Sequence, residues 1–378
     1  MAESGRRLHD VASLVVERFG ASPGAVVAAS RRIGPETVVR GVGAAGNLTY
    51  DATSAVVTPS TWFDLASVTK PFVAVTLARL QRRGVIDRSE RLGDVVASLQ
   101  ATPAARMTLD LLAAHRSGLE AHQRLFAPLE QGLPFSAPDA LVAAASALRP
   151  ECSGTAPEEG FPPVYSDMGY LLLGKALEAR CGRRLDAIVH DEVLAPLGIA
   201  LHAGSAHQLR AIDAAFDAHV APTEVVPFRG GLVRGIVHDE NAFAFVGDGL
   251  AGHAGLFGDA GAVLAFGEAI LDALAERSDW LAPADLEPVL RRRPGGTHRA
   301  GFDGRGGETP SSGSRLGAET FGHLGFTGTS LWIDPEQAFV GVLLTNRVHP
   351  TREHIAIRAA RPAAYDAMFD ALLSPLTQ

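Results

Sequence analysis

Hydrophobic positions recur with helical spacing through the middle of the chain. Ala- and Leu-rich segments keep the 3, 4, 7 spacing that places apolar side chains on one helix face. The segments with this period are 72–83, 108–114, 139–148, 169–180, 185–194 and 261–276. The pattern also predicts an opening helix over 5–19, where Leu8, Val11, Leu14 and Val15 share a face, and a closing helix over 352–372. The interior of the chain is therefore expected to be mainly helical.

Short apolar runs bounded by Gly, Pro and polar residues lie at the two ends of the chain. They are 24–30, 37–40, 331–333 and 338–345, and each is typical of a β-strand. The order strands, helices, strands, helix predicts an α+β fold, because strands and helices are segregated rather than alternating. We expect the N- and C-terminal strands to join in one antiparallel sheet, with the helical middle inserted between them.

This order predicts two structural units. Residues 1–66 and 250–378 are expected to form a discontinuous sheet subdomain, and 67–249 a mainly helical one. Loops rich in Pro and Gly separate the elements at 128–138 and 149–163. The segment 291–317 holds eight glycines in 27 residues, which predicts a long mobile loop.

Composition and charge narrow the functional classes. The chain has 378 residues, 47% hydrophobic and 20% charged, which is usual for a globular protein and far from a disordered or collagen-like one. A net charge of −8 gives no basic surface for binding nucleic acid. The sequence also contains no run of about 18 apolar residues, so it predicts no membrane-spanning helix. The first residues lack a secretory leader, so the expected location is the cytoplasm. The oligomeric state and a disulfide between Cys152 and Cys181 stay open.

Several familiar patterns lack their required context. Gly41–Gly46 and Gly247–Gly252 both match G-x-G-x-x-G, but neither connects a strand to a helix. The segment 169–176 imitates a phosphate-binding loop without its Ser or Thr and reads better as a buried helix face. No His-x-x-x-His or Cys-x-x-Cys pair and no G-x-S-x-G elbow occurs. We therefore expect no cofactor and no catalytic metal.

The segment Ser67-Val-Thr-Lys70 carries the clearest chemistry. Residues three apart share one helix face, so Ser67 and Lys70 can touch at the start of the amphipathic helix that follows. A serine hydroxyl needs an adjacent base to become a nucleophile, and a lysine serves when its environment lowers its pKa. The alternative is a helix cap beside a solvated lysine, since the pattern alone is common.

Two further segments add possible partners. Tyr165 follows a Pro-rich loop, and a tyrosine near a lysine can share a proton in acid–base steps; the alternative is a packed loop tyrosine. The segment 321–330 is Gly-rich, which allows a strand backbone to approach a ligand and complete an oxyanion hole with the N–H of Ser67. His323 is the polar side chain of that segment, and the alternative is a surface histidine on a strand edge.

Together these motifs resemble the serine β-lactamase and penicillin-binding-protein superfamily, in its class C β-lactamase-related branch. Ser-x-x-Lys, Tyr-Ser-Asp and His-x-Gly follow in the family's order. The flanking segments 111–119, 251–257, 328–335 and 343–350 are similar as well. The resemblance covers roughly residues 10–372 and implies a β-lactamase/transpeptidase-like fold, an antiparallel sheet flanked by helices with an inserted helical subdomain.

The resemblance implies a role for each matching residue. Ser67 is the acylated nucleophile, Lys70 its proton partner, and Tyr165 the group that relays the proton to the leaving group and activates water for deacylation. Gly325 lies in the substrate-binding strand, and the backbone N–H of Phe326 matches the second oxyanion donor. Asp167 stands where relatives usually carry Asn, and His323 where β-lactamases carry a Lys.

These two departures bear on the substrate. A lysine is a fixed cation suited to a carboxylate, whereas a histidine is mostly neutral near pH 7. The implied function is a serine hydrolase of small esters, amides or D-amino-acid peptides, with a small acyl compound as its partner. A weak β-lactamase, an acyltransferase and a silent ligand-binding member are the alternatives. We also hypothesise that Asp167 pairs with His323 across the site and raises its pKa.

The segment His238–Asn241 also looks familiar from this branch. It has two interpretations, a cleft-lining one and a scaffolding one, because buried polar clusters often serve the scaffold. The absent leader tilts the expectation from a cell-wall peptidase toward an intracellular esterase or peptidase.

Overall fold

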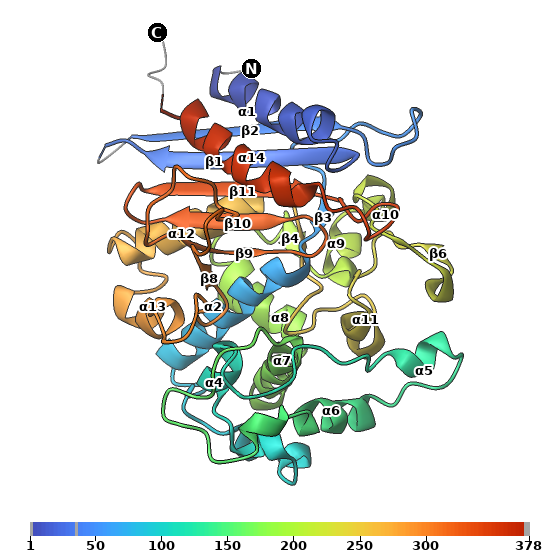
Figure 1. The fold of residues 1–378 in the computed structure, drawn as a ribbon, viewed down its shortest axis with the longest axis vertical. Helices are drawn as coiled ribbons and strands as arrows, with labels where there is room; N and C mark the ends of the chain where they lie inside the picture. Colours follow the sequence, from blue (N-terminus) through green and yellow to red (C-terminus); the bar gives the residue numbers. More distant parts are fainter. Residues whose placement is uncertain (1–2, 35–36, 374–378) are drawn as a thin grey trace.

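A six-stranded antiparallel sheet organises the protein, whose computed structural model describes residues 3–34 and 37–373 (Figure 1). Its order is β2-β1-β11-β10-β9-β8. The first strands of the chain therefore pair with the last, with Ala25 opposite Thr345, which confirms the expected joining of the two ends. The strands are β1 (Gly24–Arg32), β2 (Val38–Gly46), β8 (Asp303–Gly304), β9 (Phe321–Leu324), β10 (Ser330–Asp334) and β11 (Phe339–Thr345).

Helices cover both faces of this sheet. On one face lie α1 (Glu3–Ser13), a π-helical turn (Leu14–Arg18) and α14 (Ile357–Ala371), which crosses in front of the strands in Figure 1. On the other face α12 (Ala260–Leu274) packs on β1, β10 and β11. All seven residues of β11 are buried, because this strand is covered on both sides.

The first glycine-rich pattern has a packing role. Gly41 to Gly46 lie in β2 rather than in a nucleotide-binding turn. A Cβ at Gly43 would come within 2.1 Å of the backbone of Leu8 and His9 in α1. The missing side chain therefore lets the first helix rest directly on the edge strand.

The helical part lies below the sheet in Figure 1 and centres on two buried helices, α2 (Thr69–Arg82) and α7 (Asp167–Cys181). The pattern that imitates a phosphate-binding loop is a buried stretch of α7, as expected. The other helices there are α3 (Leu92–Val95), α4 (Leu109–Ala113), α5 (Ala127–Glu130), α6 (Ala137–Ser146), α8 (Leu185–Val189), which continues as a π-helical turn (His190–Leu194), α9 (Ala206–Ile212), α10 (Phe216–His219) and α11 (Glu240–Val246). Five 3-10 turns complete the helical set, at Ala66–Val68, Ala97–Leu99, Pro103–Arg106, Pro150–Cys152 and Pro227–Arg229.

A small three-stranded sheet links the two parts. Its order is β3 (Phe63–Asp64), β7 (Phe257–Gly258) and β4 (Ala203–Gly204), so it draws strands from both of the expected subdomains. A separate hairpin joins β5 (Val225–Val226) to β6 (Gly231–Leu232). The boundaries drawn at residues 66 and 250 stay a prediction.

The glycine-rich segment 291–317 differs from the expectation. It is largely irregular, but Arg293 and Phe302 are buried, and β8 pairs with the edge of the main sheet. A mobile loop over the whole segment was therefore wrong, because charged and aromatic side chains anchor it. The helix α13 (Pro283–Leu290) just before it was not expected either.

Two smaller points concern covalent and membrane features. Cys152 and Cys181 are both free thiols, so they form no disulfide with each other. Within residues 3–34 and 37–373, no helix is both long and apolar enough to cross a membrane.

Candidate active site

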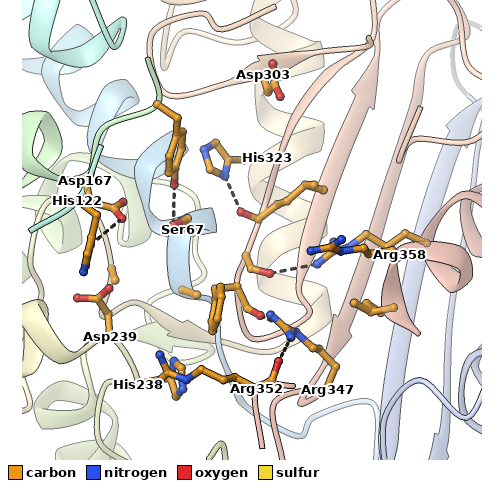
Figure 2. A pocket seen from close by; sticks show the side chains of 18 of the residues that line it. Ser67, His122, Asp167, His238, Asp239, Asp303, His323, Arg347, Arg352 and Arg358 are labelled. Atoms are coloured by element: carbon orange, nitrogen blue, oxygen red, sulfur yellow. Dashed lines mark hydrogen bonds and ion pairs between the residues drawn. The ribbon is translucent and has the colours of Figure 1, made fainter. Parts of the chain in front are cut away.

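A cavity of about 810 Å³ opens where the edge of the main sheet meets the helical part (Figure 2). Six of the seven residues singled out in the sequence line it, and the seventh, Lys70, is fully buried beside Ser67. The lining residues from that set are Ser67, Tyr165, Asp167, His323, Gly325 and Phe326. The fold thus brings the predicted site residues together from three separate segments, 67–70, 165–167 and 323–326.

Ser67 lies in the 3-10 turn that leads into α2. The preceding residue, Ala66, has a φ of 47°, a left-handed conformation that is uncommon for a residue with a side chain. The buried carboxylate of Asp64 holds this turn by accepting the Ala66 N–H at 2.8 Å. Strain of this kind persists only where the surroundings enforce it, and here it presents the serine to the cavity.

Lys70 is three residues further on and contacts the serine as the spacing predicted. Its Nζ donates to Ser67 Oγ at 2.9 Å, to Asp167 Oδ1 at 2.7 Å and to the His253 carbonyl at 3.2 Å. Burial is the largest single influence and acts to lower the pKa of Lys70, but Asp167 and Tyr165 together outweigh it and the pKa is raised. The same pairing holds the pKa of Asp167 well below its usual range despite burial, so both groups are charged.

Tyr165 contacts Ser67 from the loop before α7. Its hydroxyl donates to Ser67 Oγ at 2.8 Å. Burial raises the pKa of Tyr165 to about 12, with the Lys70 cation opposing the rise. The tyrosine is therefore neutral at rest, and its ring lies 4.8 Å below the lysine ammonium.

His323 does not pair with Asp167, so that hypothesis was wrong. Its Nδ1 donates to the Leu324 carbonyl at 2.8 Å, while the second oxygen of Asp167 faces His122 at 3.8 Å. Burial, then the nearby Lys70 cation, lowers the pKa of His323 to about 3. The imidazole is therefore neutral, and because Nδ1 carries the hydrogen, Nε2 is left as an acceptor.

Gly325 and Phe326 form the turn that leaves β9 and line the cavity with Ser67. Two threonines fasten this turn to the residues before Ser67: Thr327 donates to the Asp64 carbonyl at 2.7 Å and Thr329 to the Leu65 carbonyl at 2.9 Å. A Cβ at position 325 would lie 2.0 Å from Thr329 Oγ1, so only glycine fits. Within the described chain, the backbone N–H groups of Ser67 and Phe326 have no hydrogen-bond acceptor.

The segment His238–Asn241 both lines the cavity and supports the surrounding structure, so both interpretations of it apply. His238 and Asp239 line the cavity. They are also structural, because His238 bonds Glu224 at 3.0 Å and Asp239 accepts the Ala242 N–H that begins α11. Asp239 further bonds His253 Nε2 at 2.9 Å, and so fixes the residue whose carbonyl accepts from Lys70.

Sequence reasoning missed several residues of the site. His115 packs its ring 4.7 Å from Tyr165 and accepts the Ser166 N–H; it stands inside the quoted segment 111–119, where a histidine before a glycine-bearing turn was the available signal. The other missed residues line the cavity and come from distant parts of the chain, with Asp303 in β8, Arg358 in α14 and Arg347 inside the similar segment 343–350. They are His122, His298, Asp303, Arg347, Arg352 and Arg358.

The sequence is similar to curated proteins that are named as a carboxypeptidase and an amidase. The profile of the family described as Beta-lactamase matches residues 13–365. A putative D-alanyl-D-alanine carboxypeptidase of Escherichia coli K12 is 27% identical over 321 residues, which cover 77% of this chain and 70% of the relative. An N-acetylmuramyl-L-alanine amidase of Bacillus subtilis is 27% identical over 317 residues, covering 76% and 68%.

Solved structures share the fold at low sequence identity. A penicillin-binding-protein homologue from Caulobacter crescentus superposes with a TM-score of 0.68 at 18% identity, covering 98% of both chains. The hydrolase EstCE1, described as having promiscuous acyltransferase activity, gives 0.68 at 19% identity over 95% of this chain and 98% of its own. These likenesses establish the β-lactamase/transpeptidase-like architecture, the antiparallel sheet with its flanking helices.

Proposed function

The chain belongs to the Beta-lactamase family, and from that premise we propose that it is a serine hydrolase that forms an acyl-enzyme on Ser67. The observation that carries the proposal is the double hydrogen bond on Ser67 Oγ. Lys70 Nζ donates to it at 2.9 Å and the Tyr165 hydroxyl at 2.8 Å. These two donors hold Ser67 Oγ in place and stabilise the negative charge that grows on it as the hydroxyl loses its proton.

The charge states suggest how the proton moves. Because Lys70 is held charged by Asp167, it stabilises negative charge on the two oxygens rather than removing a proton. For the reaction the Tyr165 hydroxyl turns its hydrogen from Ser67 toward the leaving group, so that its oxygen accepts the serine hydrogen. Ser67 Oγ then bonds to the acyl carbon while its hydrogen passes to Tyr165, and the tyrosine hydrogen passes to the leaving group as the bond between that group and the acyl carbon breaks. Tyr165 is thus neutral before and after the step, in keeping with its raised pKa. Water repeats the same relay in deacylation.

Two backbone N–H groups are available to bind the oxyanion that develops during the reaction. The N–H groups of Ser67 and Phe326 are unused within the described chain, and the threonine bonds hold their two segments together. Donors that are fixed before the reaction stabilise the tetrahedral intermediate without reorganisation. We therefore assign these two N–H groups to the oxyanion hole.

The substrate class follows from His323. A neutral imidazole with a free Nε2 accepts a hydrogen bond and offers no fixed positive charge to a carboxylate. This favours small esters, amides or D-amino-acid peptides over penicillins. The carboxypeptidase and amidase names of the relatives fit amide substrates, and transfer of the acyl group to an amine or alcohol is the alternative outcome of the same acyl-enzyme.

A fluorophosphonate probe tests the proposal. We expect one equivalent of covalent mass on the intact protein, mapped by peptide sequencing to Ser67, and none on Ser67→Ala. A panel of p-nitrophenyl esters, nitrocefin and D-Ala-D-Ala peptides then ranks the substrates. Tight ligand binding with neither labelling nor turnover would show instead a silent binding member of the family.

A further inference from the structure

Arg361 is a buried cation directed at the backbone of the sheet edge. It lies in α14 and is 8% exposed. Its Nη2 donates to the Gly325 carbonyl at 3.1 Å and to the Thr329 carbonyl at 3.2 Å. The side chain thus reaches from the helix to both ends of the turn that contains Phe326.

This guanidinium has no anionic partner. Among the described residues, no carboxylate lies within 4.0 Å of it, although such pairing is usual for buried arginines. Burial lowers the pKa of Arg361 to about 10, which still leaves it charged at neutral pH. An unpaired buried charge is costly, so a reason for its retention has to lie in what it contacts.

Hydrogen-bond satisfaction does not supply that reason. The Gly325 carbonyl already accepts the Gly328 N–H at 3.1 Å, and the Thr329 carbonyl already accepts the Gly325 N–H at 2.8 Å. Both carbonyls would keep a donor if Arg361 were absent. The turn therefore does not need the arginine to complete its backbone hydrogen bonds.

The peptide group that Arg361 contacts is the informative feature. The Gly325 carbonyl and the Phe326 N–H belong to one planar peptide unit. A cation that is hydrogen-bonded to the carbonyl oxygen therefore draws electron density away from the nitrogen. Hydrogen bonds in such a chain strengthen one another. We propose that Arg361 polarises the Gly325–Phe326 peptide and fixes its plane, so that the Phe326 N–H becomes a stronger donor to the oxyanion. The inference rests on the proposed function, and Arg361 is a positioning residue within it.

An arginine outside the cavity provides the control. Arg234 is partly buried and, like Arg361, donates to backbone carbonyls, those of Val220 and Ala218. Among the described residues it has no carboxylate within 4.0 Å, and it does not line the cavity. Arg234→Met therefore removes a similarly bound charge without touching the Gly325–Phe326 peptide.

The experiment compares Arg361→Met, Arg361→Lys and Arg234→Met with p-nitrophenyl acetate. We expect kcat to fall about 10-fold in Arg361→Met with KM unchanged within twofold, since the interaction grows only in the transition state. Arg361→Lys is expected to recover part of the loss, and Arg234→Met to match the wild type. Melting temperatures show that each variant is folded, and Arg361→Lys carries the comparison if Arg361→Met does not fold.

An infrared measurement separates this role from a structural one. The ester carbonyl of the acyl-enzyme, formed with ¹³C-carbonyl p-nitrophenyl trimethylacetate, absorbs at a lower wavenumber when the oxyanion donors are strong. We expect the band to move to higher wavenumber in Arg361→Met and not in Arg234→Met. An unchanged band, or a raised KM at unchanged kcat, overturns the inference. Failure of the wild type to acylate at all overturns the proposed function, and this inference with it.

Discussion

Two sides of the cavity differ in how their charged groups are paired. The helical wall carries Ser67, Lys70, Tyr165 and Asp167, and the sheet wall carries the residues 323–329 with the arginines that contact them. On the helical wall, the Lys70 ammonium and the Asp167 carboxylate lie 2.7 Å apart and neutralise each other beside the serine. On the sheet wall, the Arg361 and Arg347 guanidiniums donate to backbone carbonyls and have no carboxylate partner in the described chain. The first arrangement suits proton movement between Ser67 and Tyr165, because the charged Lys70 beside both residues stabilises the negative charge that this movement creates. The second suits a fixed electrostatic field aimed at peptide groups.

The largest expected effect comes from breaking the helical wall at Lys70. Its substitution by Met removes the charge that stabilises the serine and tyrosine oxygens, and we expect kcat/KM to fall about 10³-fold. The chain contains only one other lysine, Lys175, which pairs with Glu178 on the far part of α7. Lys175→Met is therefore a matched control and should retain wild-type rates. Near-normal ester turnover in folded Lys70→Met would show that the serine is activated by other means.

Replacing Asp167 by Asn tests whether the ion pair between Lys70 and Asp167 matters. We expect kcat/KM to fall about 10²-fold, a smaller effect, because Lys70 stays in place but loses its counter-charge. The stability difference should depend on pH. The folded pKa of Asp167 is depressed, so its contribution is complete above the unfolded value near 4 and declines as the pH falls below it.

Melting temperatures of wild type and Asp167→Asn from pH 7 to pH 3 measure this. We expect a constant gap down to about pH 4 that narrows below it. Glu178→Gln, on the same helix, serves as the control because its carboxylate pairs with an incompletely buried lysine. A gap that stays constant to pH 3 would mean that the Asp167 charge does not stabilise the fold.

The two walls also differ in how far they could be predicted. The Ser67–Lys70 contact follows from a separation of three residues, so helical periodicity alone indicates it. Tyr165 meets Ser67 across 98 residues, and only the family resemblance gave that contact. On the sheet wall the resemblance indicated His323 and Phe326. The neutral state of His323 and the direction of Arg361 depend on burial and on helix packing, which no local pattern encodes.

A moderate effect is expected from loosening the sheet wall at Thr327. Its hydroxyl fastens the Phe326 turn to Asp64, and Thr327→Val removes that bond while keeping the side chain's shape. We expect kcat to fall about 10-fold, since a small displacement of an oxyanion donor weakens it. Thr320→Val is the control, because that buried hydroxyl donates to the Gly317 carbonyl away from the serine. Equal losses in both variants would point to general destabilisation rather than to the oxyanion hole.

The smallest expected effect is the sharpest test of the division between the walls. Because the pKa of His323 is lowered to about 3, its imidazole stays neutral from pH 5 to pH 8 and takes no part in proton movement. His323→Gln keeps a hydrogen-bonding side chain there and should give a pH–rate profile of the same shape as the wild type. The ratio of the two kcat/KM values is therefore expected to be constant across that range. If His323 instead titrated near the ordinary histidine value of about 6.5, the ratio would change around that pH. The sheet wall would then share in the proton chemistry, and the contrast between a wall that moves protons and a wall that holds a fixed field would no longer stand.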